Sequence, residues 1–163
     1  LIILTNYLGK IILKNENQTN KLGSNLFKNC KLGDIITLSG SIGIGKTTLA
    51  RSFIRQGSDV NNIPSPTYNL VQIYNSLKGK IIHFDAWRVN MPEEIIELGI
   101  LESIDKSITI IEWPENVIPY IPKNHLNVKL LFENSYRIAY FNGSRNWEKI
   151  INNLINLNLC ILK

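Results

Sequence analysis

The chain alternates short apolar runs with polar segments, and the spacing of the apolar residues predicts which segments are strands and which are helices. Runs of apolar, often β-branched residues bounded by polar turns are typical of strands. Such runs lie at 8–13, 34–38, 68–74, 80–84, 107–111, 125–132 and 136–141. The last two predict a hairpin, and a loop around Lys78 and Gly79 joins 68–74 to 80–84.

Helices are predicted in several of the intervening segments. Asn15 can cap a helix that runs to about Asn29, because Gln18 follows it as part of a capping box. Another helix covers 48–55, and Pro92 opens a third with acidic residues in its first turn. Near the C-terminus, apolar residues recur at helical spacing, a stripe that usually packs on a core: Trp147, Ile150, Ile151, Leu154 and Ile155.

This order of elements predicts a three-layer α/β fold whose mixed sheet is parallel at its centre and has antiparallel strands attached. Residues 1–163 are long enough for one domain with a proper core. Between 61 and 67, two prolines exclude a helix and predict a rigid, extended loop.

The most specific motif is a glycine-rich loop. Residues 40–47 read Gly-Ser-Ile-Gly-Ile-Gly-Lys-Thr and fit the pattern G-x-x-x-x-G-K-[ST], between a predicted strand and a predicted helix. Glycines let the backbone turn its N–H groups toward a phosphate, and the helix N-terminus adds partial positive charge. Lys46 can reach the terminal phosphates, and the Thr47 hydroxyl can ligate Mg²⁺. We therefore expect a nucleoside triphosphate to bind in a P-loop NTPase-like fold.

Two acidic residues follow predicted strands at the edge of the sheet where ligands bind in such folds. Asp85 follows 80–84, and Glu112 follows 107–111. A hydrolytic nucleotide site needs one acid for Mg²⁺ and another to orient or deprotonate the attacking water. The alternative for each acid is a salt bridge at the surface.

Three other polar residues have a structural or an open interpretation. His83 lies two positions before Asp85 on the same strand face, and we interpret it as a buried core residue with satisfied hydrogen bonds. His125 has no partner motif and is interpreted as structural. Arg88 either contacts phosphate or pairs with an acid, and the sequence favours neither.

Composition narrows the functional classes little. The chain has 18 Lys and Arg against 13 Asp and Glu, but these cations are scattered, and a codon bias explains them better than an RNA-facing surface. Cys30 and Cys160 lack metal-ligand spacing and indicate buried thiols in a reducing compartment. The apolar residues 1–4 are too few to span a membrane and lack the features of a signal peptide. We expect a cytoplasmic protein with no membrane partner.

Taken together, these motifs resemble the bacterial TsaE family, also called YjeE, over about 10–141. The resemblance depends on the order of five short segments: the phosphate loop, Ser-Pro-Thr at 65–67, His-Phe-Asp-Ala-Trp-Arg at 83–88, Pro-Glu-Glu at 92–94 and Glu-Trp-Pro-Glu at 112–115. It implies a single P-loop ATPase domain that binds ATP and Mg²⁺ and associates with the TsaB–TsaD pair. The family and this pair belong to the machinery that makes threonylcarbamoyladenosine in tRNA. Slow hydrolysis would control its cycle, and contact with tRNA would be indirect, through the complex.

The resemblance also implies roles for single residues. Nucleotide contacts fall on the loop and the start of the next helix, on Gly40, Gly43, Ile44, Gly45, Lys46, Thr47 and Thr48. Metal ligation falls on Thr47 and Glu112, and catalysis on Lys46 and on Asp85, the acid near the γ-phosphate.

Other parts of the family pattern carry weaker implications. Ser65 to Thr67 resembles a switch segment in which Thr67 would sense the γ-phosphate. Trp113 would flank the site, with a core tryptophan as the alternative. Contacts to the nucleotide base are implied near 15–19 and near Arg137.

The chain departs from the family pattern at three positions. Ser41 replaces the usual acid, Ile44 replaces a small residue, and Trp87 stands where tyrosine is frequent. We therefore expect Ile44 to place a bulky side chain beside the phosphates. The pattern does not cover the apolar segments 1–7 and 157–162, which would be packing strands or partner contacts.

Two other functions remain open. Asp85 and Arg88 would suit a small-molecule kinase as acceptor base and phosphate clamp, although no arginine-rich lid is visible between Asn90 and Ile108. A non-catalytic, nucleotide-gated binding module would need Lys46 but not Asp85.

Overall fold

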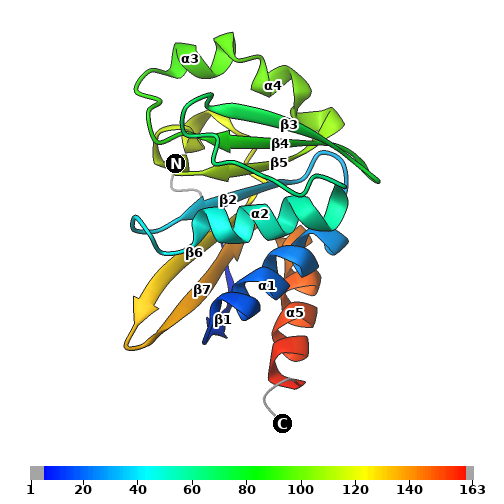
Figure 1. The fold of residues 1–163 in the computed structure, drawn as a ribbon, viewed down its shortest axis with the longest axis vertical. Coiled ribbons are helices and arrows are strands. Elements are labelled where there is room, and N and C mark those ends of the chain that lie inside the picture. The colour runs from blue at the N-terminus through cyan, green and yellow to red at the C-terminus, as the bar shows by residue number, and fades with distance from the viewer. Residues whose placement is uncertain (1–5, 161–163) are drawn as a thin grey trace.

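The computed structural model describes residues 6–160, in which a seven-stranded sheet is flanked by helices (Figure 1). The strands are β1 (Asn6–Leu13), β2 (Ile35–Ser39), β3 (Val71–Ser76), β4 (Gly79–Asp85), β5 (Ser107–Glu112), β6 (Leu126–Glu133) and β7 (Tyr136–Gly143). Their order across the sheet is β1-β7-β6-β2-β5-β4-β3. The neighbours β6, β2, β5 and β4 are parallel, whereas the β1–β7, β7–β6 and β4–β3 pairs are antiparallel. The predicted mixed sheet with a parallel centre is confirmed.

Helices cover both faces of this sheet. They are α1 (Glu16–Asn29), α2 (Lys46–Gly57), α3 (Pro92–Glu97), α4 (Ile100–Ser103) and α5 (Glu148–Cys160), with 3₁₀ turns η1 (Ile104–Lys106), η2 (Pro114–Asn116), η3 (Ile118–Tyr120) and η4 (Arg145–Trp147). Successive strand residues face opposite ways, so Ile35 and Ile36 of β2 belong to different hydrophobic clusters. The Ile36 cluster includes Phe53 of α2 and Ile151 of α5, and the Ile35 cluster includes Ile95 of α3. The three predicted layers are therefore present.

The strand expected at 68–74 begins later, at Val71. Leu70 has a left-handed backbone, with φ of 59°, which ends the preceding turn. The Arg88 guanidinium donates to the main-chain carbonyls of Thr67 and the residue after it. Residues 66–69 therefore form a turn, not an extended strand, and the Arg88 side chain connects this turn to the segment that follows β4.

The predicted ends of the helices are largely confirmed. The Asn15 side chain accepts a hydrogen bond from the Gln18 N–H at 3.0 Å, and the Gln18 side chain accepts from the Lys14 N–H at 2.6 Å, one residue before the cap. The C-terminal stripe is core packing, since Trp147, Ile151 and Leu154 are buried.

The two terminal segments are only partly described. Of 1–7 and 157–162, residues 1–5 and 161–162 lie outside the described part, while β1 begins at Asn6 and α5 continues to Cys160. No helix within residues 6–160 is long and apolar enough to cross a membrane. Cys30 is a buried free thiol, and burial raises its pKa far above the ordinary value.

Gly23 marks the place where α1 packs closely on α2. A Cβ atom at this position would lie 2.0 Å from Ser52 Oγ and 2.5 Å from the Leu49 carbonyl oxygen. We expect Gly23→Ala to lower the free energy of unfolding by about 1–3 kcal/mol, the typical cost of overpacking, although alanine favours a helix. Urea unfolding measures the change, with the exposed Asn17→Ala of the same helix as control. Equal stability of the two variants would contradict this prediction.

Candidate functional site

The glycine-rich loop connects the end of β2 to the start of α2 at the centre of the sheet (Figure 1). Gly40 has φ of 134°, and a Cβ atom there would lie 2.4 Å from the Leu130 carbonyl oxygen, so only glycine fits beside β6. Gly45, with φ of 114°, lets the chain enter α2. The Ile44 side chain is fully buried in the core and lies against Gly40. The expectation that Ile44 stands beside the phosphates is therefore wrong, because the loop turns this side chain inward.

Lys46 begins α2 and returns over the loop that precedes it. Its Nζ donates to the carbonyl oxygens of Gly40 at 2.7 Å and Ser41 at 2.8 Å, and it lies 3.5 Å from the centroid of the Trp113 ring. The side chain is only 4% exposed. Burial lowers the pKa of Lys46, and the carboxylates of Glu112, Glu115 and Asp85 oppose that shift. The loop therefore presents a partly desolvated ammonium group to the adjoining cavity.

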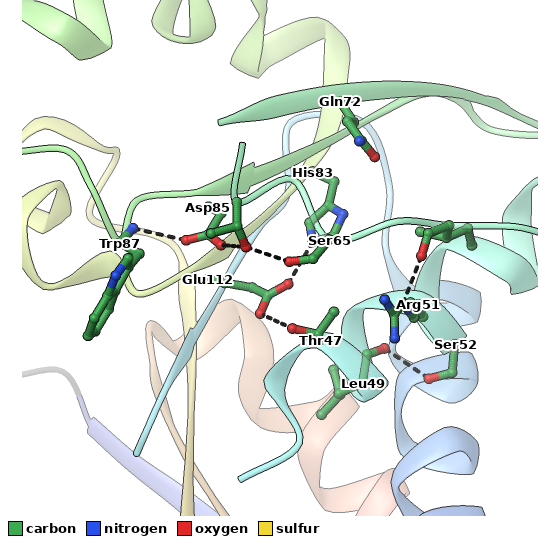
Figure 2. A network of polar contacts seen from close by, with 12 residues as sticks. Thr47, Leu49, Arg51, Ser52, Ser65, Gln72, His83, Asp85, Trp87 and Glu112 are labelled. Carbon is green, nitrogen blue, oxygen red and sulfur yellow. Dashed lines mark hydrogen bonds and ion pairs between the residues drawn. The ribbon is translucent and has the colours of Figure 1, made fainter. Parts of the chain in front are cut away.

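Glu112 is held by two side chains from different elements (Figure 2). The Thr47 hydroxyl donates to its Oε2 at 2.7 Å, and His83 Nε2 lies 2.8 Å from its Oε1. Because Asp85 is the register partner of Glu112 on the parallel strands β4 and β5, the two acids end their strands together. Both are buried, which excludes the surface salt bridge that was the alternative for each.

His83 is more than a core residue. Its burial is confirmed, with 0% exposure, but its contact with Glu112 was not anticipated, and within residues 6–160 its Nδ1 has no hydrogen-bond partner. The expectation of a satisfied histidine is wrong. The available signal was its position two residues before Asp85 on the same strand face, next to the strand that ends in Glu112.

Asp85 contacts the segment 65–67, which resembles a switch. Its Oδ2 accepts from the Thr67 hydroxyl at 2.9 Å, its Oδ1 accepts from the Trp87 N–H at 2.9 Å, and the Ser65 hydroxyl lies 2.7 Å from that of Thr67 (Figure 2). Arg51 of α2 donates to the Ile63 carbonyl at 2.7 Å and holds the start of this loop. The loop therefore places two hydroxyl groups beside the carboxylate.

Of the two roles that the sequence left open for Arg88, pairing with an acid is not seen within residues 6–160, and contact with phosphate stays a prediction. Its guanidinium donates to the main-chain carbonyls of Thr67 and Tyr68, the latter at 3.0 Å. Neither partner is an acid. Its contacts position the switch-like loop against the end of β4.

A cavity of about 310 Å³ unites these groups. It is lined by Ile42, Gly43, Gly45, Lys46, Thr47, Thr48, Ser65, Thr67, Asp85, Trp87, Glu112 and Trp113. Trp113 and Trp87 both line it, with ring centroids 4.3 Å apart and ring planes tilted by 57°, so Trp113 flanks the site and is not a core tryptophan. Two of the predicted nucleotide-binding residues, Gly40 and Ile44, do not line the cavity. The Gly40 carbonyl accepts a hydrogen bond from Lys46, and the Ile44 side chain packs in the core.

Other residues for which the sequence predicted a role do not line this cavity. His125 is buried, and its Nδ1 lies 2.8 Å from the Pro122 carbonyl oxygen, which fits the predicted structural role. Residues 15–19 do not line the cavity. Arg137 of β7 does not line it either, but its Nε donates to the Ile44 carbonyl at 2.7 Å from behind the loop.

A central parallel sheet, the strand–loop–helix unit of 35–57 and acids at the ends of β4 and β5 define a P-loop NTPase-like protein. The crystal structure of YdiB from Bacillus subtilis has the same fold, with a TM-score of 0.71 over 90% of this chain and 93% of that one, at 20% identity. Residues 13–139 match the family model described as threonylcarbamoyl adenosine biosynthesis protein TsaE. The chain belongs to the TsaE family.

Individual relatives agree with the family model. The tRNA threonylcarbamoyladenosine biosynthesis protein TsaE of Rickettsia felis is 40% identical over 128 residues, which are 76% of this chain and 74% of that protein. The protein of the same name from Haemophilus influenzae is 34% identical over 126 residues, 77% of this chain and 75% of that protein.

Proposed function

We propose that this chain binds ATP with Mg²⁺ in the loop cavity, hydrolyses it slowly, and acts in the biosynthesis of threonylcarbamoyladenosine in tRNA. The nucleotide state would control a TsaB–TsaD complex. One observation carries the proposal: Lys46, Thr47, Asp85 and Glu112 come from three separate parts of the sequence and line a single cavity at the glycine-rich loop.

The donors at the cavity suit a triphosphate. Gly43, Gly45 and Thr48 line it next to the N-terminus of α2, where main-chain N–H groups and the helix dipole favour an anion. Lys46 supplies the positive charge. Because its ammonium is held by two carbonyls and a tryptophan ring, it can exchange these neutral partners for phosphate oxygens without a large movement of the side chain.

The oxygen groups of the site suit Mg²⁺. Thr47 and Glu112 would hold it, since a hydroxyl and a carboxylate are hard oxygen ligands. Within the described part of the chain no three His, Cys, Asp or Glu side chains form a metal cluster, which fits a cation that takes most of its ligands from phosphates and water. When bound, Mg²⁺ neutralises charge on the phosphate oxygens.

Asp85 would orient the attacking water. It is 3% exposed and fixed by the Trp87 N–H and the Thr67 hydroxyl, so its carboxylate is held in one orientation. A positioned carboxylate can accept a proton from water as the new bond to phosphorus forms. The Ser65 and Thr67 hydroxyls are hydrogen-bonded to each other, and Thr67 also donates to Asp85. A γ-phosphate beside Asp85 would offer these hydroxyls a new acceptor, so their hydrogen bonds would change when ATP binds.

The role in tRNA modification rests on membership of the TsaE family and on relatives that carry the name tRNA threonylcarbamoyladenosine biosynthesis protein. Co-purification with TsaB–TsaD in ATP, in ADP and without nucleotide tests the proposed partner and its control. A binding that differs between these conditions supports the proposal. Equal binding in all three would contradict nucleotide control.

ATP turnover is tested in the same preparations. Mg²⁺-dependent release of ADP that rises when TsaB–TsaD is added is the expected result, and no turnover even in the complex would refute hydrolysis. Stimulation by nucleosides or sugars would instead identify a small-molecule kinase. The guanidinium of Arg88, which would be the phosphate clamp of such a kinase, is bound to the carbonyls of Thr67 and Tyr68.

Glu112→Gln is expected to raise the Mg²⁺ concentration required for half-maximal ATP binding by about 10- to 100-fold. Glutamine keeps an oxygen for the Thr47 hydroxyl but removes the charge that attracts the cation. A Mg²⁺ titration of ATP binding measures the shift, with the exposed Glu97→Gln as control. If both variants titrate like the unmodified chain, Glu112 does not serve the metal.

A further inference from the structure

Arg137 touches the phosphate-binding loop from outside the cavity, 93 residues away in sequence. It lies on β7, which is paired on one side with β1 and on the other with β6, so its backbone is held from both sides. Its Nε donates to the Ile44 carbonyl oxygen at 2.7 Å, and its guanidinium lies 5.2 Å from the centroid of the Phe132 ring. Arg137 does not itself line the cavity, so the contact acts on the loop only.

The hydrogen bond determines which way one peptide plane of the loop faces. In a trans peptide, the C=O and the N–H of the same plane point in opposite directions, and no cis peptide occurs among the described residues. The carbonyl of Ile44 points toward Arg137, so the N–H of Gly45 points away from it. Gly45 itself lines the cavity. The bond from Arg137 therefore directs a main-chain donor toward the proposed phosphate position.

The loop needs such a constraint at this peptide. Gly45 has φ of 114°, and glycine has no Cβ to oppose rotation of the neighbouring plane. A Cβ built on Gly45 would lie 3.7 Å from Arg137 Nε, so the guanidinium lies directly behind the loop. The buried side chain of Ile44 fixes the position of this residue, but the plane between Ile44 and Gly45 can still rotate about the two Cα atoms.

We infer that Arg137 is a positioning residue for phosphate binding: it holds the Ile44–Gly45 peptide so that the Gly45 N–H faces the phosphates. This inference rests on the proposed binding of ATP in the same cavity. The hydrogen bond carries the effect, and the positive charge of the guanidinium is secondary because its Nε is engaged on the side of the loop away from the cavity.

Three substitutions separate the hydrogen bond from the charge. Arg137→Gln keeps an N–H donor at the position of Nε and removes the charge. Arg137→Met has a methyl group at that position and lacks both. Arg137→Lys keeps the charge but has a methylene there, with its nitrogen one bond further along.

The affinities of ADP and pyrophosphate, measured by calorimetry, are the readout. We expect Arg137→Met and Arg137→Lys to weaken both by about 10-fold or more, and Arg137→Gln to stay within about 3-fold of the unmodified chain, as for loss or retention of one hydrogen bond. The thermal unfolding temperature of each variant is recorded as well. If Arg137 had a purely structural role, the variants would lose stability, and their nucleotide affinities would not follow the order given above.

The opposite order would overturn the inference. If Arg137→Lys binds well and Arg137→Gln does not, the side chain acts through its charge. If all three bind like the unmodified chain, the peptide needs no support from β7. Absence of binding by the unmodified chain would refute the proposed function itself, and this inference with it.

Discussion

Asp85→Asn is expected to bind ATP as tightly as the unmodified chain, or slightly more tightly, and to lose turnover by on the order of 100- to 10,000-fold. Asparagine has the same shape, and its oxygen can still accept from the Trp87 N–H. The fold of the site is therefore preserved. What disappears is the negative charge that would orient water and accept its proton beside the Thr67 hydroxyl.

Two measurements on one preparation test this expectation. Calorimetry with a non-hydrolysable ATP analogue gives the affinity, and release of ADP in the presence of TsaB–TsaD gives the turnover. Asp59→Asn removes the same charge at an exposed position after α2 and serves as control. Turnover in Asp85→Asn close to that of the control would remove this residue from the mechanism.

Lys46→Ala is expected to lose affinity for ADP and ATP by roughly 100-fold or more, because charge-assisted hydrogen bonds to phosphate each contribute about 1.5–3 kcal/mol. The stability of the fold should change little. Burial already lowers the pKa of this ammonium, so removing it also relieves a desolvated charge. Glu112 keeps its contacts with Thr47 and His83.

Lys149→Ala, at an exposed position in α5, is the matched control. Nucleotide binding by Lys46→Ala at the level of this control would contradict the assignment of the cavity. Comparison with the aspartate variant gives a further distinction. If Asp85→Asn supports tRNA modification while Lys46→Ala does not, the chain acts as a nucleotide-gated binding module in which hydrolysis is dispensable.

Much of the site was predictable because it depends on local sequence. The loop of 40–47 needs glycine at Gly40 and Gly45 for positive φ and close packing, and both have such a backbone in the structure. Strand-end acids were also predictable. The carboxyl ends of parallel neighbours meet at one edge, and Asp85 and Glu112 are register partners there.

The errors arise where a contact joins distant segments. Ile44 was expected beside the phosphates, but its direction depends on a core formed by residues from many elements. His83 was expected to be satisfied, but within residues 6–160 its Nδ1 has no partner, and the contact of its Nε2 is with Glu112, 29 residues away. The strand expected at 68–74 begins only at Val71, and the turn before it contacts Arg88, 20 residues after Tyr68.

The sequence alone determined the order of strands and helices along the chain, the glycine loop and the acids at the strand ends. Each of these depends on a short-range property: the spacing of apolar residues, the backbone freedom of glycine, or the residue that follows a strand. Only the tertiary structure decided that the Trp87 and Trp113 rings lie against each other beside the cavity and that Arg137 of β7 hydrogen-bonds the loop. Those contacts depend on how seven strands are ordered in space, and residues far apart in the chain carry no local pattern that reveals their pairing.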